Sequence, residues 1–412
     1  MSLLFTAAVM ACAVSGTPGL ESALIFPPEK MHNHSASIVE MPGGDLLAVW
    51  FHGRGEKSDD TLVLQGARKP KGAAAWSAPF VVADNPGLPD QNPVVFIDPD
   101  GVLYLWWISA LANTRETYFL QYRTATNYEG EGAPKWDRSG FITIPPPNLA
   151  AAMDAMADTV DAKFGAAFDS EKKYRERLIH GQRMARFDET YIDDWDEPVI
   201  GRLAHMLSWM PRCQPIMLQD GRLTIGLYSD VYMTSLACFT TDGGATWTYG
   251  EPMPDYGLIQ PAFLQRKDGT LVAYGRDKGP LKKIRAAESS DAGQTWTKFY
   301  DLPIDNPDSS LSAIVLASGR WLMIANDLTG QDGRHGRSRL VALLSEDEGA
   351  TWPWKRAIED STAPPEFKPH ASYPTAIQAR NGAIHIVYTY TPVEGECIKH
   401  VTLSEDWIRA AE

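Results

Sequence analysis

The sequence predicts an all-β protein, a six-bladed β-propeller with a helical insertion, and three observations support this prediction. The pattern Ser/Thr-x-Asp-x-Gly-x-Thr-Trp occurs three times, at Thr240–Trp247, Ser289–Trp296 and Ser345–Trp352. Tryptophans recur at intervals of roughly 50 to 60 residues, the length of a four-stranded blade. Six apolar segments with strand-like composition each open on a glycine, namely Gly44, Gly101, Gly221, Gly269, Gly319 and Gly382.

The residue types of the repeated pattern suit a tight turn between two antiparallel strands. Asp242, Asp291 and Asp347 can accept backbone N–H bonds across the turn. The glycine of each copy can adopt a positive φ, and the tryptophan can pack beneath the turn. We therefore interpret these aspartates as structural and not as catalytic groups.

One interval between repeats, from Gly101 to Gly221, is about twice the length of a blade. Residues 146–198 within it have a helical composition, with few β-branched residues and apolar positions at helical spacing. We expect a helical insertion in a single propeller domain that spans residues 1–412. The insertion is compatible with a lid or rim over one end of the propeller and with an oligomer contact, and the oligomeric state stays open.

The composition argues against several classes of partner. The net charge is −14 and no run of Lys or Arg occurs, which argues against nucleic acid and anionic membranes. An acidic ligand would need a local cluster of arginines. We expect no membrane span and no cofactor. A metal site is not expected either, because the cysteines lack CxxC spacing. They are Cys12, Cys213, Cys238 and Cys397.

The beginning of the chain bears on its location. Residues 1–16 hold an apolar run followed by small residues, which resembles a short secretory signal. No Lys or Arg precedes this run, and a strand that closes a propeller would have the same apolar character. A secreted or periplasmic location and a cytoplasmic one both stay open.

The three Asp-boxes, the six units and the strand-opening segments together resemble the sialidase (neuraminidase) superfamily, in particular its bacterial BNR-repeat branch. The resemblance covers nearly the whole chain apart from the helical insertion. It implies an exo-acting glycoside hydrolase that cleaves a terminal, acidic sugar from a glycan. Members bind the substrate carboxylate with three arginines, attack with a tyrosine paired to a glutamate, and use an aspartate as acid/base.

Local motifs carry some of these roles to this sequence. Tyr373, in ASYPTAIQARNGAIHIVYTY, matches the nucleophilic tyrosine of the family. Arg276, in GTLVAYGRDKG, matches one carboxylate-binding arginine, and Arg337 has the best offset for another. Asp59 or Asp60, in RGEKSDDTLVL, falls at the place of the acid/base aspartate. Loop aspartates are more often merely solvated, so this last assignment rests on the resemblance alone.

Two positions depart from the family pattern. His34 stands where the first arginine is expected, and Gln260 stands where the glutamate partner of the tyrosine is expected. The first change removes a bidentate contact with a carboxylate, and the second removes the base that would take the proton of the tyrosine.

In place of the missing arginine and glutamate, the sequence has several histidines near the expected site. His32, His34 and His52 lie on or beside the first strands, and His370 precedes Tyr373 by three residues. Histidine can act as base or acid near neutral pH. A set of His, Tyr and Arg resembles propeller-fold polysaccharide lyases that act on ulvan or rhamnose-glucuronate linkages. Substrate contacts are expected from Arg54, Gln260, Arg276, Arg337 and His370.

Three hypotheses remain. The first is a sialidase-type exo-glycosidase with Tyr373 as nucleophile. The second is a lyase or unusual glycosidase for uronate- or rhamnose-containing glycans, in which His34, His52, Tyr373 and Arg276 carry the chemistry. The third is a propeller that binds a glycan without catalysis.

Overall fold

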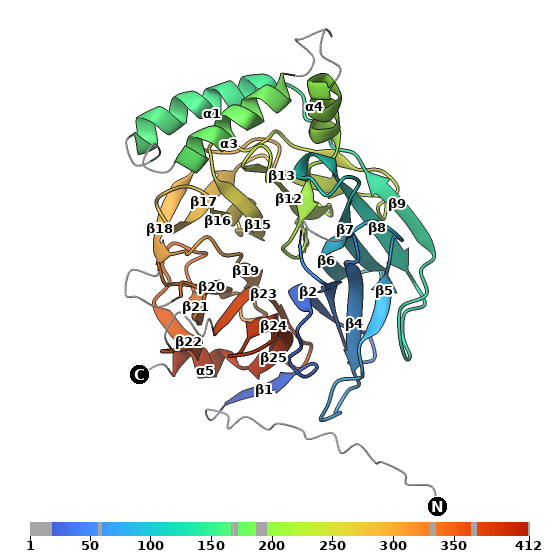
Figure 1. Ribbon diagram of the computed structural model, residues 1–412. Coiled ribbons are helices and arrows are strands. Elements are labelled where there is room, and N and C mark those ends of the chain that lie inside the picture. Colours follow the sequence, from blue (N-terminus) through green and yellow to red (C-terminus); the bar gives the residue numbers. More distant parts are fainter. Residues whose placement is uncertain are drawn as a thin grey trace, which may run out of the picture.

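The computed structural model describes residues 19–56, 60–165, 168, 172–186, 196–329, 335–363 and 369–410. Six β-sheets within these ranges are arranged as blades around a common axis (Figure 1). The predicted six-bladed propeller is therefore confirmed. The signal-like run at the start of the chain lies outside the described residues.

Each blade is an antiparallel meander whose first strand lies nearest the axis and whose later strands follow outward (Figure 1). The first two blades comprise β2 (His32–Glu40), β3 (Leu46–Gly53), β4 (Val63–Lys69) and β5 (Phe80–Ala83), then β6 (Asp90–Ile97), β7 (Leu103–Ala110), β8 (Tyr118–Ala125) and β9 (Arg138–Ile142). The third comprises β10 (Met210–Pro211), β11 (Ile216–Met217), β12 (Leu223–Ser229), β13 (Thr234–Thr240) and β14 (Thr248–Tyr249).

The remaining blades follow the same plan. The fourth and fifth comprise β15 (Leu258–Gln265), β16 (Leu271–Asp277), β17 (Lys283–Ser289) and β18 (Tyr300–Asp305), then β19 (Ser312–Val315), β20 (Trp321–Asn326), β21 (Arg339–Ser345) and β22 (Trp354–Asp360). The sixth comprises β23 (His370–Gln378), β24 (Ile384–Thr391), β25 (Cys397–Leu403) and β1 (Leu20–Leu24).

The sixth blade joins the two ends of the chain. Strand β1 pairs antiparallel with β25, so that Leu20 lies opposite Leu403 and Leu24 lies opposite Lys399. Helix α5 (Glu405–Arg409) follows β25. This pairing closes the ring of blades through backbone hydrogen bonds.

Buried apolar side chains of the described residues form six clusters, one in each space between neighbouring blades. Trp107, for example, packs with residues of the first blade, and Trp321 packs with residues of the fourth. Both faces of a blade are covered in this way. The strands therefore read as nearly continuous apolar runs, such as Leu103–Ala110.

Each turn of the repeated pattern joins the last two strands of one blade and packs against the preceding blade. In the second copy, the Asp291 carboxylate accepts hydrogen bonds from the backbone N of Thr295 at 2.9 Å and from its hydroxyl at 2.6 Å. In the third copy, a Cβ on Gly349 would lie 2.1 Å from the Tyr274 hydroxyl of the preceding blade, so no other residue fits there. The Trp352 ring packs edge-on against the same tyrosine.

The segment between β9 and β10 is helical, with α1 (Leu149–Phe164), α3 (Lys172–Ala185) and α4 (Asp196–Met206). These helices lie at the rim of the propeller, beside the blades that contain β12 and β17 (Figure 1). The buried positions of α1 recur every three or four residues and pack with Tyr232 of the third blade. Helix α4 extends past the expected boundary at residue 198. None of the helices in the described ranges is long and apolar enough to cross a membrane.

Replacement of Asp291 by alanine removes the acceptors that hold its turn. We expect a loss of about 1 kcal/mol in the free energy of unfolding, measured by chemical denaturation. Asp291→Asn keeps one acceptor oxygen and should lose less. Equal stabilities of the alanine variant and the wild type would contradict the structural assignment of this aspartate.

Candidate active site

Four of the innermost strands carry the same irregularity near the axis. In β2, β6, β15 and β23, two residues stand opposite a single residue of the next strand, which is a β-bulge. The first bulge residue has a left-handed backbone in each case, with φ of 58° at Ser35, 53° at Asn92, 56° at Gln260 and 57° at Tyr373. Bulges redirect side chains away from the regular alternation of a strand.

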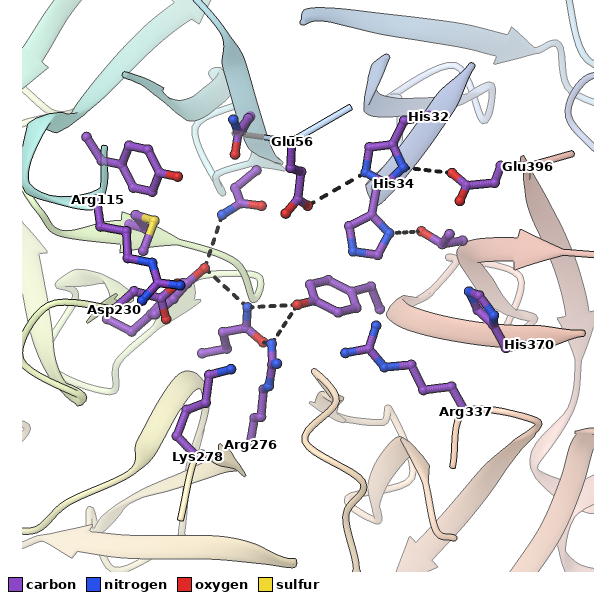
Figure 2. A pocket seen from close by; sticks show the side chains of 18 residues that line it. His32, His34, Glu56, Arg115, Asp230, Arg276, Lys278, Arg337, His370 and Glu396 are labelled. Carbon is purple, nitrogen blue, oxygen red and sulfur yellow. Dashed lines mark hydrogen bonds and ion pairs between the residues drawn. The ribbon is translucent and has the colours of Figure 1, made fainter. Parts of the chain in front are cut away.

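A cavity of about 380 Å³ lies where these bulges meet, and all six blades contribute to its walls (Figure 2). Three of the bulge side chains, those of Asn92, Gln260 and Tyr373, border it. The lining residues are His32, His34, Glu56, Gln91, Asn92, Arg115, Tyr118, Met210, Tyr228, Asp230, Gln260, Arg276, Lys278, Arg337, His370, Tyr373, Thr389 and Glu396.

Six of the residues expected from sequence come together at this cavity, although they are far apart along the chain. They are His34, Gln260, Arg276, Arg337, His370 and Tyr373.

Three other expected residues are not among those that line the cavity. His52 lies on β3, one strand farther from the axis, and its Nδ1 is 3.0 Å from Asn33 Oδ1. Asp60 is exposed and accepts a hydrogen bond of 3.0 Å from Asn113 Nδ2. Arg54 is also exposed. The structure therefore does not bring these three residues to the cavity, and Asp59 lies outside the described residues.

Tyr373 is buried at the centre of the site, and its hydroxyl is held by polar side chains from another blade. Arg276 Nη1 donates a hydrogen bond to this hydroxyl at 2.6 Å, and Gln260 Nε2 lies 3.5 Å away. The Arg337 guanidinium lies 5.2 Å from the centre of the tyrosine ring. Burial raises the pKa of the phenol, but Arg276 and Arg337 outweigh it, so the pKa of Tyr373 lies below its usual value of 10.

A third arginine, Arg212, is buried beside the same ring, with its guanidinium 5.2 Å from the ring centre. It donates hydrogen bonds to Thr375 Oγ1 at 3.2 Å and to the Pro374 carbonyl at 3.1 Å. Both acceptors are neutral, and no carboxylate of the described chain pairs with this guanidinium. Sequence reasoning missed Arg212, which lies in the irregular segment between β10 and β11.

Asp308 connects the cations below the tyrosine. Its carboxylate lies 2.5 Å from Arg276 Nε and 3.2 Å from Lys278 Nζ, and its carbonyl accepts a bond of 2.9 Å from Arg337 Nη2. Burial raises the pKa of Asp308, but these cations hold it well below its usual range. Asp308 therefore fixes the positions of the cations through ion pairs.

The two neighbouring histidines differ in charge. Burial, together with the nearby His32 and Arg337, keeps the pKa of His34 well below 6.5, so His34 is neutral. Its ring centre lies 4.1 Å from that of Tyr373. Burial also opposes protonation of His32, but hydrogen bonds to Glu396 and Glu56 raise its pKa to about 9. His32 Nδ1 lies 2.8 Å from the Glu396 carboxylate.

Some of the lining residues that were not expected could have been found from the sequence. Asn92 precedes a proline, as Gln260 and Tyr373 do, and this X-Pro pair marks the bulge. Lys278 follows Arg276 by two residues, which places both on one face of an extended chain. The carboxylates of Glu56, Asp230 and Glu396 come from connections between strands and have no local signal.

The fold and its axial cavity define a sialidase-like propeller. The chain belongs to the BNR repeat-like domain family, which matches residues 44–138 and 193–386. The resemblance found in the sequence is therefore confirmed. No curated protein matches the chain by sequence similarity.

Solved structures support the same fold. A protein of unknown function from Dyadobacter fermentans is 16% identical with a TM-score of 0.64, and the match covers 94% of this chain and 100% of that one. Trypanosoma rangeli sialidase in complex with sialic acid is 13% identical with a TM-score of 0.61, over 95% of this chain and 60% of that one. The intramolecular trans-sialidase from Ruminococcus gnavus in complex with oseltamivir carboxylate is 14% identical with a TM-score of 0.60, over 92% and 96%. At these low sequence identities, the structural similarity shows a shared fold alone.

We expect Tyr373 to ionise below pH 10, as monitored by the ultraviolet difference spectrum between the wild type and Tyr373→Phe. Arg337→Met should move the midpoint upward, because it removes a positive charge that favours the phenolate. Arg380→Met, which changes a surface arginine paired with Glu40, should leave the midpoint unchanged. A wild-type midpoint at or above 10 would rule out this electrostatic effect.

His32 should titrate with a midpoint of about 9 in an NMR experiment. Glu396→Gln should lower the midpoint, since a neutral amide stabilises the imidazolium less. Because the folded-state pKa exceeds the unfolded value of 6.5, the stabilisation is complete below pH 6.5 and is lost as the pH rises through about 9. A wild-type midpoint near 6.5 would refute the ion pair.

Proposed function

We propose that this protein is a sialidase-type glycoside hydrolase that removes a terminal, acidic sugar from a glycan. The observation that carries the proposal is the buried Tyr373 hydroxyl, hydrogen-bonded to Arg276 at 2.6 Å in a cavity of about 380 Å³. Cavities of this size suit small ligands and sugar rings. The coarser assignment to a glycan-processing fold agrees with the family and its structural neighbours.

The charges at the cavity support an acidic sugar. Arg276, Lys278, Arg337 and the protonated His32 border it, whereas the whole chain carries a net charge of −14. Arg337 uses one terminal nitrogen to bind the Asp308 carbonyl. Its other terminal nitrogen is available to a substrate carboxylate, which arginine binds well.

Tyr373 is the proposed nucleophile. Its phenolate oxygen would bond to the anomeric carbon while the glycosidic bond breaks and an acid protonates the leaving oxygen; water would then release the sugar from the tyrosine. With Gln260 in place of a carboxylate base, the guanidinium groups favour the phenolate, so its proton passes to solvent. Glu56 and Asp230 are the cavity carboxyl groups proposed for acid catalysis.

One observation favours a second candidate, β-elimination beside a uronic acid. The neutral His34 lies beside Tyr373, with ring centres 4.1 Å apart. In this reaction His34 would take the proton next to the uronate carboxylate, Arg337 would neutralise that carboxylate, and Tyr373 would protonate the leaving oxygen.

Incubation with sialosides and with glucuronate-rich oligosaccharides separates these candidates. We expect a free acidic sugar without the ultraviolet absorbance of an unsaturated uronate. Tyr373→Phe should lower kcat by about 100-fold or more, by analogy with loss of a positioned acid or base. Asp242→Ala changes a turn outside the cavity and is the control that should keep wild-type turnover.

The opposite results are equally informative. An increase in the absorbance of an unsaturated uronate that is absent in His34→Ala would show that the reaction is elimination and not hydrolysis. Glycan binding without turnover of any substrate would support the hypothesis of a propeller that binds glycans without catalysis.

A further inference from the structure

A second hollow adjoins the axial cavity on the side of the helical insertion. It is bordered by α3 on one side and by the short helix η1 (Arg115–Thr117) on the other. The hollow between α3 and η1 measures about 220 Å³.

This groove shares two lining residues, Arg115 and Asp230, with the axial cavity. Figure 2 shows both on one side of the cavity, across from His32 and Glu396. A hydrogen bond of 2.8 Å between His180 of α3 and Glu116 of η1 holds the insertion against the propeller. The groove is therefore built jointly by the insertion and the second and third blades, next to the proposed site of bond cleavage.

The groove is bordered by three cationic side chains, those of Arg115, Lys173 and Arg177, and by three carboxylates, those of Glu116, Glu176 and Asp230. The carboxylate of Glu116 is paired with His180, and that of Glu176 is paired with Lys172 at 3.0 Å. Arg115 and Arg177 are both half-buried and border the groove. Neither guanidinium makes a hydrogen bond or ion pair with the described part of the chain. A partly desolvated guanidinium gains from a carboxylate or sulfate partner.

Asp230 supplies an acceptor at the junction of the groove and the axial cavity. Its Oδ1 is buried and has no hydrogen-bond partner within the described ranges. A sugar hydroxyl that spans the junction can donate to this oxygen. The junction thus offers an acceptor for a neutral hydroxyl, and the groove beyond it offers two cations.

We propose that the groove between α3 and η1 is a second subsite, which binds a carboxylate- or sulfate-bearing sugar adjacent to the one held in the axial cavity. The proposal rests on the proposed function, because it extends the same substrate outward from Tyr373. It assigns a role in substrate selection to the helical insertion, which supplies Arg177.

Binding to the full chain tests the subsite without any need for turnover. The background is Tyr373→Phe, and the probes are a uronate-containing tetrasaccharide, its sulfated counterpart and its carboxyl-reduced neutral form. We expect Arg177→Gln to weaken binding of the two charged probes at least fivefold by calorimetry and to leave the neutral probe unchanged. Arg177→Lys keeps the charge and should recover part of the affinity.

Arg183→Gln is the matched control, because it makes the same substitution on the same helix at an exposed residue that does not line the groove. It should bind all three probes like the parent. A preference for the uronate or for the sulfated probe, lost in Arg177→Gln, identifies which anion the groove takes. Equal affinities of Arg177→Gln and Arg183→Gln for the charged probes would overturn the subsite.

The two proposals fail in distinguishable ways. If no glycan is ever turned over, the proposed hydrolase is wrong, but the charge-dependent difference between Arg177→Gln and Arg183→Gln can still be measured. If Arg177→Gln weakens the neutral probe as much as the charged ones, a general disturbance of α3 explains the loss and the anion subsite is refuted.

Discussion

The left-handed bulges of the innermost strands are the constraint on which the site depends. In a regular strand, side chains alternate between the two faces of a blade and pack against the neighbouring blades. At Asn92, Gln260 and Tyr373 the bulge breaks that alternation, and these side chains border the axial cavity instead. A left-handed non-glycine residue costs roughly 1 to 3 kcal/mol. The apolar clusters between the blades hold the strands firmly enough to offset this cost.

The charges around Tyr373 give a physical reason for Gln260, which stands where the family pattern has a glutamate. Arg212, Arg276 and Arg337 surround a single phenol, and among the described residues only Asp308 provides a carboxylate contact to this group of cations. A glutamate at position 260 would supply a second negative charge. With an amide there, the negative charge must come from the phenolate or from a bound substrate, and both fit an enzyme that binds acidic sugars.

The sequence predicted the fold and a large part of the site because both depend on local patterns. The repeated turns and glycine-opened strands gave the six blades, and strand motifs placed Arg276 and Tyr373 at the axis. His52 and Asp60 do not line the cavity, because strand order and loop path decide which residues reach the axis. Arg212 was not predicted because its segment between β10 and β11 has no regular pattern of apolar residues.

The pairing of β1 with β25 also has a consequence for folding. These strands are separated by nearly the whole chain, so their contact has a very high sequence separation, which slows folding. During synthesis, β1 emerges early and stays unpaired until β25 is complete. The blade that carries Tyr373 is therefore the last to be finished, and the cavity acquires its central phenol only when the ring can close.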